Sequence, residues 1–197
     1  MRSTTPICCC LLISVQLLPA PQNPGRPKKI LTPEQQAYQR ELKQLWAERQ
    51  RLRAQAKQAF DAEMGREKAG DCPSARTNYD WNMCLSREAG VTDGNYKTFA
   101  EAIRSDLGLK EPLAPGEKAG PLPPGPAGPQ LTPEENLAEF DRLEAAWKPY
   151  LDAACTATFH QFGGGTGGPP AAGECRQRMV REHMRELDQI YYGPLHR

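Results

Sequence analysis

The stretch LTPEENLAEFDRLEAAWKPYLDAACTATFH, residues 131–160, decides the fold class. Thr132 can cap a helix, Pro133 fits the first helical position, and Glu135 completes a capping box. Apolar side chains then recur at steps of three and four residues, which places them on one helical face: Leu137, Phe140, Leu143, Trp147, Leu151 and Cys155. We therefore predict an amphipathic helix over residues 133–159.

The same kind of start, LTPEQ, occurs at residues 31–35. It opens a predicted amphipathic helical arm over residues 31–68. A seam of alternating four- and three-residue steps runs along this arm: Tyr38, Leu42, Leu45, Arg49, Leu52, Ala56 and Ala59. Because a charged residue and two alanines weaken the seam, two interpretations stand. The arm packs on its own domain, which we favour, or it pairs with a second copy of the chain.

The sequence pattern predicts three further, shorter helices. Residues 75–88 follow a Cys-Pro-Ser start and are predicted to form a helix that breaks at Gly90. A second short helix follows over residues 95–107 and ends at Gly108, and a last helix covers residues 174–191. Strand patterns are almost absent. The sequence therefore predicts an all-α fold.

The first 20 residues have the outline of a secretory signal peptide. Arg2 precedes an apolar run over residues 7–18, which is too short to span a bilayer comfortably, and Ala20 is a small residue before a Pro-rich stretch. Cysteines at residues 8–10 permit a lipid-anchored alternative, but the residues before them lack the small side chains expected there. We expect an exported protein, periplasmic or extracellular, and favour this over a lipid anchor.

Two stretches rich in proline divide the mature chain. Residues 21–30 form a polar spacer, and a Pro- and Gly-rich insert occupies about residues 110–130. Neither composition can form a helix or pack a core. The predicted organisation is the spacer, the arm at residues 31–68, and a cysteine domain at residues 71–191 that the insert interrupts.

Removal of the leader leaves four of the seven cysteines: Cys72, Cys84, Cys155 and Cys175. An even number in an exported chain predicts two disulfides. A helix over residues 75–88 would separate Cys72 from Cys84 by roughly 18 Å of rise, which is beyond disulfide reach. We therefore favour crossed pairing between the two cysteine segments over local pairing within each segment.

Several function classes find no support in the composition or the motifs. The net charge of +1 provides no field that favours nucleic acid. The cysteine spacings contain no CxxC, and His160, His183 and His196 are scattered, so we expect no metal site and three surface histidines. Residues 163–168 follow a helix and lack the lysine of a phosphate-binding loop. We expect no cofactor, no small-molecule substrate and no enzymatic activity.

Three sequence features surround the cysteines in a defined order. The first joins two cysteines through Thr, Asp and Asn: Cys72, Thr77, Asp80, Asn82 and Cys84. The second is a tryptophan followed by an aromatic residue, an Asp and a cysteine: Trp147, Tyr150, Asp152 and Cys155. The third is a Gly-rich loop before the last cysteine: Gly163, Gly164, Gly165, Thr166, Gly167, Gly168 and Cys175. Together they resemble the lysozyme-inhibitor LprI-like domain, a bacterial extracytoplasmic family.

The resemblance covers roughly residues 71–107 and 131–191, and it includes departures. Leu151 and His183 stand where arginine is common in the family, and Pro149 lies inside the predicted helix. The resemblance implies a helical, disulfide-braced fold more firmly than it implies an activity.

The leading hypothesis from the resemblance is a binding module that blocks a lysozyme-type muramidase by occlusion. Residues 163–168 are the candidate contact loop, although the same residues also suit a simple connector between two helices. The competing hypothesis is a structural protein of the cell envelope that self-associates through the arm. The expected partners are therefore a protein, such as a lysozyme, or a component of the cell envelope.

Overall fold

The computed structural model describes residues 31–118, 120 and 131–193. The predicted signal peptide, the spacer, most of the predicted insert and His196 lie outside the described residues. From Thr32 onward, the described residues belong to one compact unit. All the structural statements below refer to this part of the chain.

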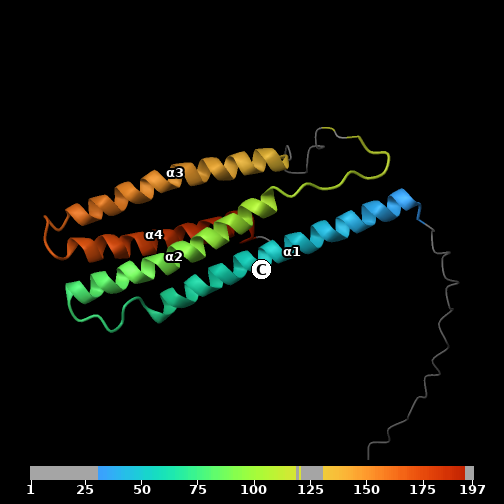
Figure 1. Ribbon diagram of the computed structural model, residues 1–197. Coiled ribbons are helices and arrows are strands. Elements are labelled where there is room, and N and C mark those ends of the chain that lie inside the picture. Colours follow the sequence, from blue (N-terminus) through green and yellow to red (C-terminus); the bar gives the residue numbers. More distant parts are fainter. Residues whose placement is uncertain (1–30, 119, 121–130, 194–197) are drawn as a thin grey trace, which may run out of the picture. The chain divides into compact units, whose positions relative to one another are not determined.

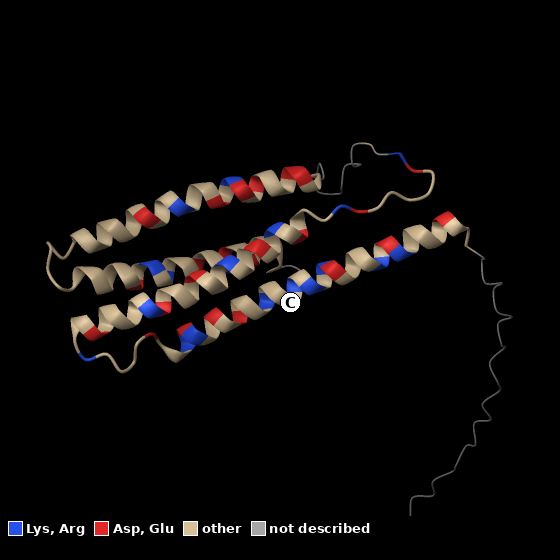
Figure 2. Cartoon of the chain, viewed as in Figure 1, with Lys and Arg blue, Asp and Glu red and all other residues tan. Residues whose placement is uncertain are grey.

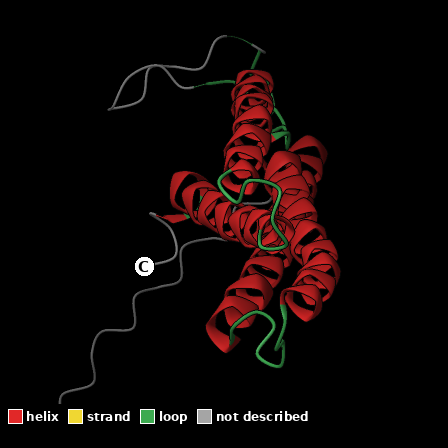
Figure 3. Ribbon diagram, turned by 90° about the vertical axis from the view of Figure 1, so that its left-hand side faces the viewer, coloured by secondary structure: helices red, strands yellow, loops and turns green. Residues whose placement is uncertain are grey.

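Four helices make up the unit and run alternately in opposite directions (Figure 1): α1 (Pro33–Ala69), α2 (Asn78–Leu107), α3 (Pro133–His160) and α4 (Gly168–Tyr191). Within the described ranges no segment is a strand, as Figure 3 shows. The all-α prediction is confirmed. None of the described helices has both the length and the hydropathy that a membrane span requires.

Helix α1 begins at the predicted capping box, in which the Thr32 side chain accepts from the Gln35 amide at 3.2 Å. It packs against α2 along the predicted seam. The seam is buried at Leu52, Ala56 and Ala59 and only partly buried further toward the N-terminus. Arg49, which interrupts the seam in sequence, is accommodated by an ion pair with Asp106 of α2 at 3.2 Å.

Helix α2 differs from the prediction because it is one continuous helix. The sequence pattern predicts a break at Gly90, yet helical backbone continues through Gly90 and Gly94 to Leu107. Both glycines are exposed, and each costs the helix on the order of 1 kcal/mol relative to alanine. Burial of Phe99 and Ile103 against the other helices offsets that cost, because helical stability in proteins comes mainly from tertiary packing.

Helices α3 and α4 form an antiparallel pair joined by the Gly-rich loop. The capping box at Thr132 and Glu135 is present, and Pro149 lies within α3 without ending it. Helix α4 begins at Gly168, earlier than the predicted residue 174, because Pro169 and Pro170 suit the first positions of a helix.

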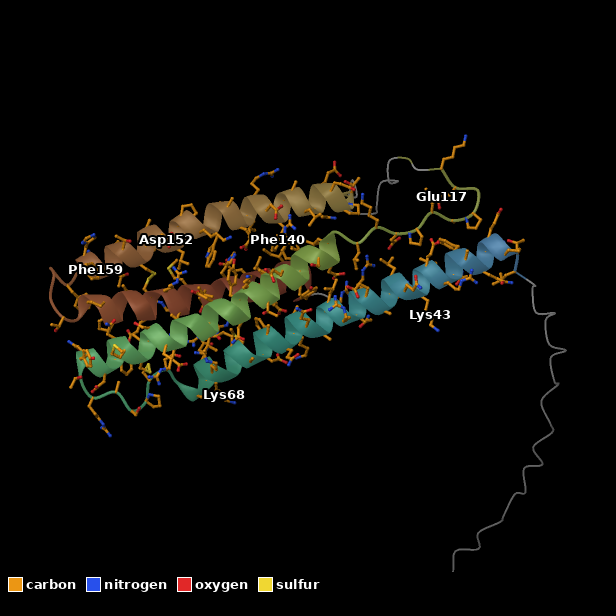
Figure 4. All side chains as sticks on the ribbon, in the orientation of Figure 1. Lys43, Lys68, Glu117, Phe140, Asp152 and Phe159 are labelled. Atoms are coloured by element: carbon orange, nitrogen blue, oxygen red, sulfur yellow. A yellow bond between two sulfur atoms is a disulfide. The ribbon has the colours of Figure 1, made fainter. Side chains whose placement is uncertain are left out.

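The core lies where α4 packs against α2 and α3. Its fully buried members come from α1, α2 and α4: Ala56, Phe99, Ala102, Ile103, Val180, Met184 and Leu187. Phe140 and Leu151 close it from α3; Figure 4 labels Phe140, whose side chain points from α3 toward the other helices. Positions of Lys and Arg are interspersed with positions of Asp and Glu along the helices (Figure 2).

Both cysteine pairs are local, so the crossed pairing favoured from the sequence is wrong. Cys72 bonds to Cys84, with Cα atoms 5.8 Å apart, and Cys155 bonds to Cys175, with Cα atoms 5.5 Å apart. The error came from starting the second helix at residue 75. Residues 70–77 are a loop in which Gly70 and Cys72 have φ values of 83° and 53°, and this loop returns Cys72 to the side of the new helix.

Candidate functional site

The α1–α2 loop (residues 70–77) and the α3–α4 loop (residues 161–167) lie at the same end of the bundle, which we call the loop end (Figure 1). A hydrogen bond from the Asn78 side chain to the Thr166 hydroxyl, 3.3 Å long, connects the two segments directly. The indole N–H of Trp81 also donates to Glu174 at 2.6 Å. The first cysteine segment and the Gly-rich loop, remote in sequence, therefore form one surface.

The α3–α4 loop is a series of tight turns. Its backbone amides at Gly163, Gly165 and Gly168 donate to carbonyls three residues earlier, at 3.1, 2.8 and 3.1 Å. Gly163 and Gly164 have φ values of 54° and 80°, which side-chain-bearing residues rarely adopt. The glycines thus allow a defined loop and not merely a flexible one. The loop also connects two antiparallel helices, as the simpler interpretation of the sequence requires.

Two aromatic rings pack directly against glycines, one in this loop and one at the start of α4. A Cβ atom on Gly167 would lie 2.8 Å from Cδ1 of Phe162, and one on Gly168 would lie 3.1 Å from Cδ2 of Phe159. Figure 4 labels Phe159 near the end of α3. Gly168 is buried, whereas Phe162 remains 48% exposed. The loop therefore holds an aromatic side chain in a fixed place at the surface.

A groove of about 460 Å³ runs beside the loop and is bordered by Trp81, Phe162, Cys175 and Arg178. Its acidic residues are mostly neutralised, since Asp71 forms a bidentate pair with Arg181 at 2.5 and 2.8 Å. Arg178 is exposed and forms no ion pair with any described residue. The groove thus combines aromatic surface with two side chains, Glu174 and Arg178, that form no ion pair with the described residues.

A larger groove, of about 590 Å³, lies at the opposite end of the bundle. Arg49 and Arg53 both bind Asp106 there, at 3.2 and 3.1 Å, and Arg49 also approaches Glu111 at 3.6 Å. The guanidinium groups of this groove already bind acidic side chains. They are therefore less available to a ligand than the volume of the groove suggests.

The motif residues predicted from the sequence do not form a single site. Thr77 and Asp80 make a capping box at the start of α2, with the Asp80 amide donating to the Thr77 hydroxyl at 3.1 Å. The backbone carbonyl of Asn82 accepts a hydrogen bond from the Ser86 hydroxyl at 2.8 Å. These positions shape the loop end and carry no chemistry of their own.

The second motif lies away from the loop end, along α3. Tyr150 is 65% exposed. Asp152 accepts from Arg176 of α4 at 3.5 Å, and Figure 4 labels Asp152 on α3. Trp147 instead packs inward, beside His183.

His183 is buried, which contradicts the predicted surface position. Its Nε2 lies 2.9 Å from the Glu144 carboxylate and its Nδ1 lies 3.2 Å from Glu186. The Tyr96 hydroxyl donates to the same Glu144 carboxylate. The sequence carried a signal for this, because His183 falls beside Val180 and Met184 on the apolar stripe of α4. His160 is exposed, as predicted.

Burial and hydrogen bonding change the pKa of Glu144 in this cluster in opposite directions. Burial alone raises the pKa of Glu144, but the hydrogen bonds from His183 and Tyr96 outweigh burial and hold the pKa below its ordinary value. Burial and the neighbouring carboxylate raise the pKa of Tyr96 far above its ordinary value. Glu144 is therefore an ionised hydrogen-bond acceptor that braces α2, α3 and α4 against one another.

A second buried carboxylate, Glu63, was not identified from the sequence. Its side chain is inaccessible to solvent and accepts hydrogen bonds from four side chains: Arg66 (2.6 Å), Thr92 (2.9 Å), Asn95 (2.8 Å) and Arg181 (2.9 Å). Burial raises its pKa, but bonds from Asn95, Arg181 and Thr92 reverse that effect and lower it. Glu63 occupies the next position of the α1 seam after Ala59, which would have marked it as buried.

The described residues contain no group of three or more His, Cys, Asp or Glu side chains arranged to hold a metal ion. The Glu63 and Glu144 carboxylates are each held by side chains within the bundle, and Arg181, which binds Glu63, also borders the groove beside the loop. The loop end is therefore the best-formed candidate for recognition. Comparison of the chain with family models, with curated proteins and with solved structures finds no match.

Proposed function

We propose that this chain is an exported, non-enzymatic binding module whose loop end blocks the substrate cleft of a lysozyme-type muramidase. The carrying observation is the α3–α4 loop, which combines three turn hydrogen bonds, a tie to α2 and an exposed aromatic ring. A loop fixed before binding loses less conformational entropy when it enters a cleft, and this favours affinity. The disulfides indicate an oxidising environment, which supports the exported location.

The position of the Cys155–Cys175 disulfide supports the same proposal. It joins α3 to α4 within a few turns of the loop and limits how far the two helices can separate. On the neighbouring side, the Cys72–Cys84 disulfide ties the α1–α2 loop to α2. Both ends of the contact surface are thus braced covalently.

A turbidity assay tests the proposal. Purified mature protein is added to C-type and G-type lysozymes acting on suspended cell walls, and we expect inhibition at micromolar concentration or below. Thr166→Trp, which adds bulk to the loop, should weaken inhibition, whereas Val91→Trp on the outer face of α2 serves as the matched control because Val91 is also exposed. Absence of inhibition by the unmodified protein would exclude the proposal.

A second candidate is a cell-envelope scaffold that self-associates through α1. Trp46 is 53% exposed, and Tyr38, Leu42 and Leu45 on the N-terminal part of the seam are only partly buried. Sedimentation of the mature chain distinguishes this candidate. A dimer that Trp46→Ala weakens would support it, and a monomer at high micromolar concentration would remove its basis.

A further inference from the structure

The α3–α4 loop differs from the other described loops in its charge. Residues 161–167 read QFGGGTG and carry no ionisable side chain, and Figure 2 shows the loop free of charged colours. The α1–α2 loop beside it carries Asp71 and Arg76. Removing a charge from water is costly unless the charge is paired, so the neutral loop is the less costly one to bury in a partner.

Phe162 is the large side chain of this neutral loop. Its ring rests against the backbone of Gly167, and its carbonyl accepts the turn hydrogen bond from Gly165 at 2.8 Å. The ring is therefore held in place although 48% of the residue is exposed. An aromatic side chain held on an exposed loop has the features of an interface anchor, because it buries much surface at low entropic cost.

The backbone around Phe162 supplies hydrogen-bond donors. The amides of Gly164 and Thr166 have no acceptor among the described residues, and both residues are exposed. A muramidase cleft places a pair of carboxyl groups next to the site that holds the sugar rings. Backbone amides can donate to such carboxylates, and the loop contains no acidic side chain that would repel them.

We infer that Phe162 is the specificity-determining contact of the loop end: its ring occupies a sugar-binding subsite of the muramidase cleft, with the amides of Gly164 and Thr166 facing the carboxylates. The inference rests on the proposed function and names the residue through which it acts. The ring presents a flat apolar face to the place where the polysaccharide would lie.

Two substitutions test separately whether inhibition requires the Phe162 ring and whether it requires the ring in its present position. Phe162→Ala removes the ring and should raise the inhibition constant on the order of tenfold or more. Gly167→Ala keeps Phe162 but places a methyl group where the ring now lies, while the φ of −78° at Gly167 is open to alanine. It should weaken inhibition in the same direction. Tyr150→Ala, an exposed aromatic on α3, is the matched control and should change nothing.

A competition measurement provides a readout that does not depend on how the variants fold. Binding of the unmodified protein to a muramidase is measured by calorimetry with and without a chito-oligosaccharide that fills the sugar subsites. We expect the oligosaccharide to reduce the apparent affinity at least tenfold. Equal affinity with and without the oligosaccharide would overturn the inference.

The possible outcomes distinguish failure of this inference from failure of the proposed function. If the unmodified protein inhibits no muramidase, the proposed function fails and the inference fails with it. If it inhibits and the Phe162→Ala protein, with an unchanged circular dichroism spectrum, inhibits equally well, only the inference fails. Loss of inhibition in both loop variants, with Tyr150→Ala unaffected, supports both.

Discussion

The indole of Trp147 lies flat against the imidazole of His183, with ring centroids 4.1 Å apart and an angle of 9° between the planes. This stack fixes the imidazole between the carboxylates of Glu144 and Glu186. It joins α3 to α4 near the middle of both helices. Trp147, a residue of the second sequence motif, therefore stabilises the fold by holding α3 against α4.

His183→Ala should destabilise the protein by about 2 kcal/mol, because it leaves the buried Glu144 carboxylate with one hydrogen bond fewer. Urea denaturation followed by circular dichroism measures the change in the free energy of unfolding. His160→Ala is the control, since His160 is exposed, and it should have little effect. Equal effects of the two substitutions would contradict a bracing role for His183.

Stability should fall in acid. The pKa values of Glu63 and Glu144 are lower in the folded protein than their ordinary value of 4.5. Both carboxylates therefore stabilise the fold above about pH 4.5, and this contribution is lost as the pH falls through their folded pKa values. Urea denaturation between pH 3 and pH 6 should show the decline. Glu144→Gln should flatten the curve, whereas Glu174→Gln at the exposed loop end should leave its slope unchanged.

Loss of either disulfide should destabilise the protein. The Cys155–Cys175 and Cys72–Cys84 bonds close loops with sequence separations of 20 and 12 residues, and each is expected to contribute about 3 kcal/mol by loop-closure entropy. The double substitution of Cys155 and Cys175 by alanine should lower the unfolding free energy by about that amount. Non-reducing peptide mapping checks the connectivity, and a peptide joining Cys72 to Cys155 would be inconsistent with the structure.

Gly90→Ala and Gly94→Ala should each stabilise α2 by up to about 1 kcal/mol, because alanine has the higher helix propensity and nothing lies within 4 Å of either added Cβ. Gly173→Ala in α4 is the contrasting variant. Its Cβ would lie 3.3 Å from Cβ of Leu85, so the gain in propensity should be reduced or reversed. Thermal denaturation measures all three. A loss of stability in the α2 variants would contradict the open, helical placement of these two glycines.

Much of the architecture could be predicted from local signals. The capping boxes at Thr32 and Thr132 gave the starts of α1 and α3, and the three- and four-residue apolar spacing gave their inner faces. These features depend on neighbours within one helical turn. The all-α class followed from them, with no need for long-range information.

The failures have two physical causes: tertiary packing overrode local preference in the middle of α2, and local signals at the start of α2 and on α4 were overlooked. The break predicted at Gly90 lies inside a helix that buried contacts carry through to Leu107. The capping box at Thr77 and Asp80 was missed, so the helix start was placed three residues too early and the disulfide pairing was inferred wrongly. His183 was treated as a polar surface residue although its position on α4 is apolar in character.

The candidate site was only partly predictable. The Gly-rich loop was identified, but its tie to α2 through Asn78 and the fixed ring of Phe162 depend on segments remote in sequence. Glycine spacing alone did not distinguish a defined turn series from a flexible connector. That distinction required the φ values at Gly163 and Gly164 and the backbone hydrogen bonds.

Each disulfide of the bundle lies within one helical hairpin, α1–α2 or α3–α4. A single cut of the backbone between Leu107 and Pro133 would therefore yield two polypeptides with no covalent link through these bonds, associated only through contacts such as the ion pair of Glu63 with Arg181 at 2.9 Å. The nicked protein should migrate as a single species in native electrophoresis and as two bands in detergent without reductant. The described fold therefore consists of two helical hairpins, each containing its own disulfide, which are joined to each other through the backbone between Leu107 and Pro133.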